Sequence, residues 1–61
     1  MNYRVGSIIE YRPFGGGTRR VCVEAKEADI KNGRPGFDGV QINTGDHCWG
    51  YDNQITKVVK L

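Results

Sequence analysis

Apolar and polar residues alternate along several short stretches of the chain, as they do in β-strands that bury one face. The clearest stretch is Thr18–Lys26, in which Val21, Val23 and Ala25 occupy every second position. The alternate residues then point to the opposite face: Arg20, Cys22, Glu24 and Lys26. The pattern predicts a strand with Val21, Val23 and Ala25 inward.

A first strand is expected over Val5–Arg12, which is rich in β-branched and aromatic residues and is followed by Pro13. Ile9 and Tyr11 share one face of this strand. Phe14–Gly17 contains three successive glycines, which are costly to order and readily take positive φ. We therefore expect a flexible loop between the first two strands.

The pattern changes over residues 27–38. Glu27–Ile30 suits one irregular or helical turn, and Asn32-Gly33 and Arg34-Pro35-Gly36 are two turn signatures. The segment is therefore predicted to be a long excursion rather than a strand. A third strand is expected to begin only at Gly39.

The last third of the chain predicts short strands separated by tight turns. In order, these elements are a strand at Gly39–Asn43 with Val40 and Ile42 on one side, a hairpin turn at Thr44–Asp46 with Gly45 at positive φ, a strand at His47–Tyr51, a 3₁₀ turn at Asp52–Gln54 and a strand at Ile55–Leu61.

Five short strands with no long helix predict an all-β fold. A chain of 61 residues has room for only one core, so residues 1–61 are expected to form a single domain. Closing the strands into a small barrel would bury one face of each strand and remove exposed edges. We therefore expect a five-stranded small β-barrel with one short 3₁₀ turn near Asp52–Gln54.

The order of these elements resembles that of a Src-homology-3-like small barrel, and the resemblance covers almost the whole chain. It rests on the strand that begins at Gly6-Ser7-Ile8-Ile9-Glu10-Tyr11, the glycine-rich loop, the paired middle strands and the turn at Asp52–Gln54. The signalling version of this fold binds proline-rich peptides through an acidic loop and a Trp pair. Here that loop is Pro13–Gly17 and there is one Trp, so the resemblance does not extend to that recognition.

Two stretches, Asn32–Gly39 and Trp49–Ile55, look like those of small uncharacterised proteins from actinobacteria and their phages. This second resemblance implies no function.

The net charge of +2 is too small to indicate nucleic-acid binding by itself. It divides into +3 for residues 1–26, −3 for residues 27–54 and +2 for residues 55–61. The chain has no run of apolar residues long enough for a membrane helix and no secretory signal pattern, so we expect a cytoplasmic protein. Cys22 and Cys48 are expected to be free thiols, with a single disulfide as the alternative.

No catalytic or metal site is predicted. His47 and Cys48 are neighbours in a strand and should therefore project to opposite faces. Cys22 and Cys48 are too far apart in the sequence to resemble a structural zinc motif. Gly15–Arg20 leads into a strand, whereas a phosphate-binding loop opens a helix. We expect a protein that is not an enzyme and has no cofactor.

The leading hypothesis is a small accessory protein that binds a protein partner through an aromatic patch between two loops. Aromatic and Arg side chains dominate the energetics of such interfaces. The candidate residues lie at the glycine loop, in the excursion and in the fourth strand: Phe14, Arg34, Phe37, Asp38, Trp49 and Tyr51. The purely structural alternative is that these rings cover a thin hydrophobic core and bind no partner.

The alternative is a nucleic-acid-binding barrel, with cations tracking phosphates and Trp49 or Tyr51 stacking on bases. The candidate cations are Arg12, Arg19, Arg20, Lys26 and Lys57. A third hypothesis is a homo-oligomer that pairs through an edge strand, because an incompletely closed barrel leaves such an edge.

Overall fold

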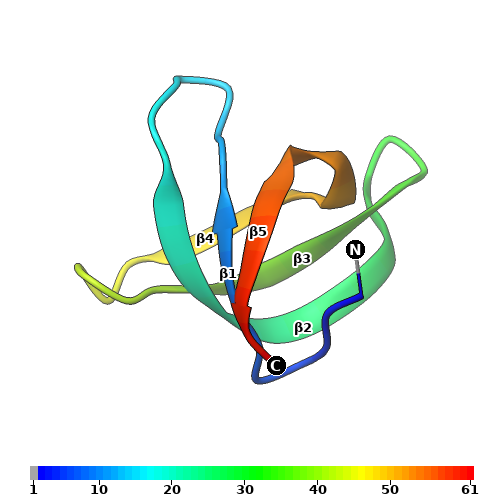
Figure 1. The fold of residues 1–61 in the computed structure, drawn as a ribbon. Coiled ribbons are helices and arrows are strands. Elements are labelled where there is room, and N and C mark those ends of the chain that lie inside the picture. The colour runs from blue at the N-terminus through cyan, green and yellow to red at the C-terminus, as the bar shows by residue number, and fades with distance from the viewer. Residues whose placement is uncertain (1) are drawn as a thin grey trace.

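A computed structural model describes residues 2–61 of the chain. It confirms the all-β fold, with a five-stranded antiparallel sheet in the order β4-β3-β2-β1-β5 (Figure 1). The elements are β1 (Ile8–Tyr11), β2 (Arg19–Lys31), β3 (Arg34–Gln41), β4 (His47–Tyr51), the 3₁₀ turn η1 (Asp52–Gln54) and β5 (Ile55–Lys60). No helix within residues 2–61 is long and apolar enough to cross a membrane.

The long strand β2 gives the sheet its curvature. Its first four residues, 19–22, pair with β1, and from Val21 onward it pairs with β3 as far as Lys31. The pairing slips between Val23 and Ala25 and again between Glu27 and Lys31. Such irregularities increase the local twist and bend a strand, and Figure 1 shows β2 curving from β1 round to β3.

The sheet is open in its hydrogen bonding. Strands β4 and β5 lie at the two ends of the strand order, and no β4–β5 pairing is present within residues 2–61. The predicted five strands are therefore confirmed, whereas the predicted closure of the barrel is not.

The core lies on the inner face of the curved sheet. As predicted, Ile9 and Tyr11 from β1 alternate inward, as do Val21 and Val23 from β2. Residues of the other segments complete it: Tyr3, Phe37 and Cys48, with Ile55 and Val58 packed against them. Strand pairing places Ile9 opposite both Val21 and Val58, so three strands contribute to one apolar layer.

The segment before β1 is fastened across this core. The Tyr3 hydroxyl donates to an Asp52 carboxylate oxygen, and the Lys26 ammonium donates to the Tyr3 carbonyl at 2.8 Å. The same ammonium lies 4.1 Å from the centre of the Tyr3 ring. Burial, together with the hydrogen bond to Asp52 and its negative charge, raises the pKa of Tyr3.

The prediction of a long excursion over residues 27–38 is wrong. Strand β2 continues to Lys31, and a two-residue turn at Asn32-Gly33, with φ of 58° and 72°, leads directly into β3. Two positive φ angles are typical of the turn that best fits a twisted hairpin. Pro35 is tolerated because it lies where the β2–β3 pairing slips.

The third strand also differs from its prediction. It spans Arg34–Gln41 rather than Gly39–Asn43, and Ile42 lies in the following turn with 46% of its surface exposed. The predicted strand His47–Tyr51 and the 3₁₀ turn Asp52–Gln54 are confirmed with the same bounds. Gly45 has the expected positive φ, at 75°.

Candidate binding surface

Three aromatic rings form a continuous series on one side of the molecule. The Phe14 and Tyr51 ring centres are 6.0 Å apart, and the Trp49 and Tyr51 centres are 5.5 Å apart, both in edge-to-face geometry. Phe14 is 83% exposed and Trp49 41% exposed, whereas Tyr51 is buried between them. We call Phe14, Trp49 and Tyr51 the aromatic face.

Two cations from the β2–β3 hairpin lie on this face. The Lys31 ammonium is 5.5 Å from the Trp49 ring centre, and the Arg34 guanidinium is 4.3 Å from that of Tyr51. Asn32 donates a side-chain N–H to the Tyr51 hydroxyl at 3.3 Å. Cation–π contacts at partly exposed sites contribute about 0.5–1 kcal/mol each, so the hairpin tip is held against the rings.

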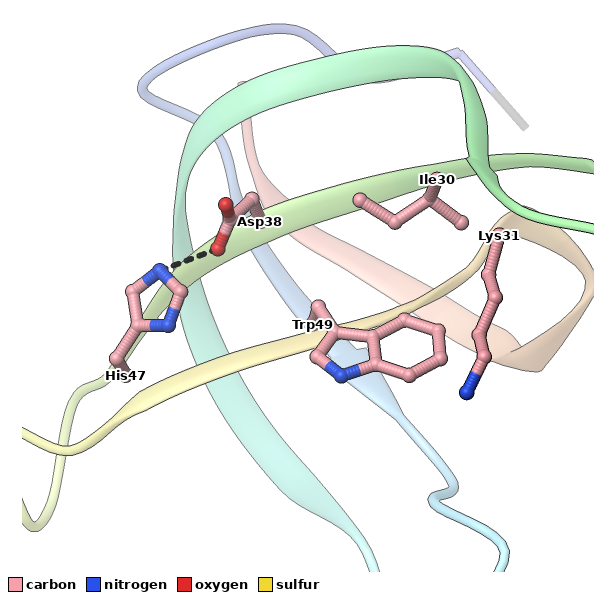
Figure 2. A pocket seen from close by; sticks show the side chains of 5 residues that line it. All are labelled: Ile30, Lys31, Asp38, His47 and Trp49. Atoms are coloured by element: carbon pink, nitrogen blue, oxygen red, sulfur yellow. Dashed lines mark ion pairs between the residues drawn. The ribbon is translucent and has the colours of Figure 1, made fainter.

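An open hollow of about 340 Å³ adjoins the aromatic face. Figure 2 shows Ile30 lying over β3 and the Trp49 indole beside β4, with Lys31 at one end and the Asp38–His47 pair at the other. Ile30 and Trp49 provide apolar walls, and the two ends are charged or polar. The hollow can therefore accept a side chain that has an apolar body.

Gly36 allows the end of β2 to approach β3 at the hollow. A Cβ atom on Gly36 would lie 2.2 Å from the carbonyl oxygen of Gly50 and 2.4 Å from Cγ2 of Ile30. These distances are far shorter than any ordinary carbon contact, so a larger residue would displace the strand or the Ile30 side chain. The shape of the hollow thus depends on the absence of a side chain at this position.

Asp38 and His47 form an ion pair at the end of the hollow. Asp38 is the cross-strand partner of Trp49, and its Oδ1 atom is buried beside Nε2 of His47. The two atoms are close enough for an ion pair but are not aligned as a hydrogen bond. A protonated His47 would neutralise the Asp38 charge.

The structure brings together five of the six residues in the candidate protein-binding set: Phe14, Arg34, Asp38, Trp49 and Tyr51. Phe37 is the exception, since none of its surface is exposed. Its ring packs edge-to-face on Tyr11 and Tyr3, with centres 5.0 and 6.3 Å away. Its assignment to a surface patch is corrected, because β3 already includes residue 37 and directs that side chain inward.

Ile30, Lys31 and His47 were missed as residues of this surface. The Asn32-Gly33 dipeptide is the sequence feature that indicates the positions of Ile30 and Lys31. If that dipeptide is taken as a two-residue hairpin turn, Lys31 becomes the strand partner of Arg34. Nothing comparable in the sequence places His47 beside Asp38.

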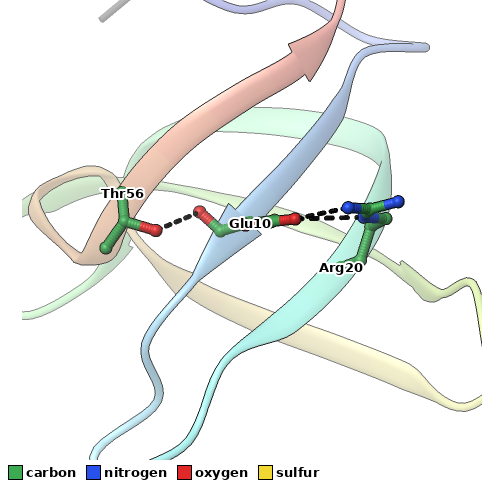
Figure 3. A network of polar contacts seen from close by, with 3 residues as sticks. All are labelled: Glu10, Arg20 and Thr56. Carbon is green, nitrogen blue, oxygen red and sulfur yellow. Dashed lines mark hydrogen bonds and ion pairs between the residues drawn. The ribbon is translucent and has the colours of Figure 1, made fainter.

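Three of the five cations of the nucleic-acid hypothesis, Arg20, Lys26 and Lys57, lie beside groups outside the aromatic face. Arg20 donates from Nε and Nη2 to one oxygen of Glu10 at 3.2 and 2.6 Å, while Thr56 donates to the Glu10 carbonyl at 3.3 Å (Figure 3). This pairing holds the pKa of Glu10 below its ordinary value, and Lys57 adds to the effect. Lys26 is engaged with Tyr3.

A second hollow of about 240 Å³ lies beside the Arg20–Glu10 pair, lined by Glu10, Thr18, Arg20 and Asn43. It shares no lining residue with the hollow beside the aromatic face. The remaining cations of the hypothesis, Arg12 and Arg19, are exposed.

Both cysteines are free thiols, as expected. Cys22 is half-buried, whereas Cys48 is buried, and burial raises the pKa of the Cys48 thiol. The exposed His47 and the buried Cys48 alternate along β4 as predicted. Among residues 2–61, no group of three or more His, Cys, Asp and Glu side chains is placed to hold a metal ion.

Comparison of the chain with protein-family models, curated proteins and solved structures finds no match.

Proposed function

We propose that this chain is a non-catalytic binding module, a small accessory protein that engages a protein partner through the aromatic face and its adjoining hollow. The observation that carries the proposal is the pair of exposed rings, Phe14 and Trp49, joined through the buried Tyr51. Tyr51 anchors the centre of the face, so a partner would meet a preformed surface.

The energetics support this use of the rings. Fully burying a large apolar side chain contributes about 1.5–3 kcal/mol, and Phe14 has most of its surface available for burial. Trp, Tyr and Arg are the residue types that most often dominate interface energies. Trp49, Tyr51 and Arg34 combine all three at one place.

At the level of the fold, we propose that the curved sheet is a Src-homology-3-like small barrel left open between β4 and β5. The loop after β1 and the β2–β3 hairpin flank the aromatic face, as binding loops flank the groove in barrels of that type. Two free thiols support a reducing, cytoplasmic location for the module.

Affinity capture from a plausible host lysate tests the proposal. The immobilised baits are the wild-type chain, Trp49→Ala, Phe14→Ala and Leu61→Ala, and each capture is run with and without nuclease. Leu61 is the matched control because it is an exposed apolar residue outside the aromatic face. Circular dichroism confirms that each bait is folded.

The proposal predicts proteins that bind the wild-type and Leu61→Ala baits, bind the Trp49→Ala and Phe14→Ala baits weakly, and survive nuclease treatment. Equal capture by all four baits would exclude the aromatic face as the interface. Loss of all specific capture after nuclease would favour the nucleic-acid hypothesis instead.

A further inference from the structure

We propose that the partner segment presents one carboxylate beside an apolar side chain, with the carboxylate bound between Lys31 and Arg34 and the apolar side chain in the hollow beside Trp49. This inference rests on the proposed function and specifies the chemistry of the partner at that site.

The two cations are positioned together by the hairpin. Lys31 and Arg34 are cross-strand partners that flank the Asn32-Gly33 turn, and each lies over a ring of the aromatic face. Neither forms an ion pair with any carboxylate of residues 2–61. Their positive charges are therefore available to an incoming anion.

Three of the five carboxylates of residues 27–54 contact other groups of the chain. Asp38 pairs with His47, Asp29 accepts the Gly33 backbone N–H at 2.7 Å, and Asp52 accepts the Tyr3 hydroxyl. The other two are Glu27 and Asp46, and none of the five forms an ion pair with Lys31 or Arg34 within residues 2–61. A carboxylate supplied by a partner would complement the two cations that remain.

The same charges favour a single carboxylate over a nucleic-acid strand. Base stacking needs a free ring face, and Lys31 and Arg34 each cover one face of the Trp49 and Tyr51 rings, which reduces the ring surface open to bases. The surrounding segment is net −3 over residues 27–54, so a polyanion that extended beyond the two cations would be repelled. A single carboxylate at Lys31 and Arg34 adds less negative charge near the acidic residues of this segment than a polyanion does.

The apolar part of the motif is matched by the hollow. Its volume of about 340 Å³ lies between Ile30 and Trp49, and Lys31 stands at the end nearest the hairpin tip (Figure 2). A Leu, Ile or Phe of the partner can therefore lie between the apolar walls while an adjacent Asp or Glu reaches Lys31. Recognition then requires the acidic and the apolar residue side by side.

Selection from a phage-displayed library of random dodecapeptides tests this inference. The targets are the wild-type chain, Trp49→Ala, the double variant Lys31→Glu/Arg34→Glu, and the control Arg4→Glu/Lys60→Glu. Both double variants change the net charge equally, and Arg4 and Lys60 are exposed residues outside the aromatic face. Selected peptides are then synthesised and titrated, together with a dodecameric oligothymidine, at two salt concentrations.

The inference predicts wild-type peptides with Asp or Glu next to a large apolar residue. The control should bind them unchanged, Trp49→Ala should lose them, and Lys31→Glu/Arg34→Glu should bind them about tenfold or more weakly. Peptides that need Trp49 but show no acidic enrichment would overturn the inference and leave the proposed function standing. The absence of any Trp49-dependent peptide, or tight salt-sensitive binding of the oligothymidine at Trp49, would overturn both.

Discussion

The Trp49 indole and the Tyr51 ring are nearly perpendicular, with centres 5.5 Å apart and planes inclined by 87°. Tyr51 is itself fixed, because its backbone N–H donates to the Gln54 side chain at 2.8 Å and its hydroxyl accepts from Asn32. A buried ring held at both ends thus orients an exposed one. This relationship supports the proposal that Trp49 is an interface residue, because the indole is held in one orientation before a partner binds.

The different burial of Trp49 and Phe37 predicts that alanine destabilises the fold far less at position 49 than at position 37. Trp49→Ala should lower the free energy of unfolding by only about 1 kcal/mol, because the indole is partly exposed. Phe37→Ala should cost about 3–5 kcal/mol, enough to unfold much of so small a domain. Urea denaturation measures both, and a Trp49→Ala variant as unstable as Phe37→Ala would place the indole in the core.

Gly36 should be far less tolerant of alanine than Gly15. The new Cβ at position 36 would lie 2.2 Å from a backbone carbonyl, whereas nothing lies within 4 Å of a Cβ at position 15. We expect Gly36→Ala to cost about 1–3 kcal/mol and to change the Trp49 fluorescence by displacing Ile30. Thermal denaturation and emission spectra measure these effects. Similar stability and spectra for both variants would contradict the close approach of Gly50 and Ile30 to Gly36.

The free energy of unfolding should decrease at acidic pH, and Glu10 should contribute to this decrease. Its pKa is lowered in the folded chain, chiefly by the hydrogen bond from Arg20. The contribution of the Glu10–Arg20 pair to stability is therefore fully present above the unfolded-state pKa of Glu10, which is about 4.3. It is lost as the pH falls through the pKa of Glu10 in the folded chain. Denaturation of Glu10→Gln between pH 2 and 7 should show a flatter acid limb than the wild type. The same dependence of stability on pH in both proteins would show that the Glu10–Arg20 pair contributes nothing.

The two thiols should react at different rates. Cys22 is half-buried, while Cys48 is buried and its thiol pKa is raised by that burial, so it carries less thiolate at neutral pH. Timed alkylation at pH 7.5 followed by mass spectrometry should show one fast and one slow adduct. Cys22→Ser should remove the fast adduct. Loss of the slow adduct in that variant would reverse the assignment.

The sequence correctly predicted those parts of the fold in which a single local pattern, such as the alternation of apolar residues, is enough to identify the element. The alternation of Val21 with Val23, and of Ile9 with Tyr11, identified the inner faces of β1 and β2. The 3₁₀ turn at Asp52–Gln54 was also evident, because too few residues separate the flanking strands for a longer element.

The hairpin was missed because two turn signatures, Asn32-Gly33 and Arg34-Pro35-Gly36, lie next to each other. Asn32-Gly33 makes the actual turn, whereas Pro35 and Gly36 belong to β3, one at a slip in pairing and the other under the Ile30 side chain. Only the tertiary contact with Ile30 explains why a glycine is needed inside that strand. The same error placed Phe37 in a loop and hid its position in the core.

The central claim is that a protein partner binds the aromatic face, and an NMR titration tests it most directly. A partner obtained by capture is added to the ¹⁵N-labelled chain while the Trp49 indole N–H and all backbone amides are followed. We predict that shift changes concentrate at the Trp49 indole, Phe14, residues 31–34 and residues 47–51. An unchanged indole, with changes confined to the side of Arg20, Glu10 and Lys57, would contradict the claim.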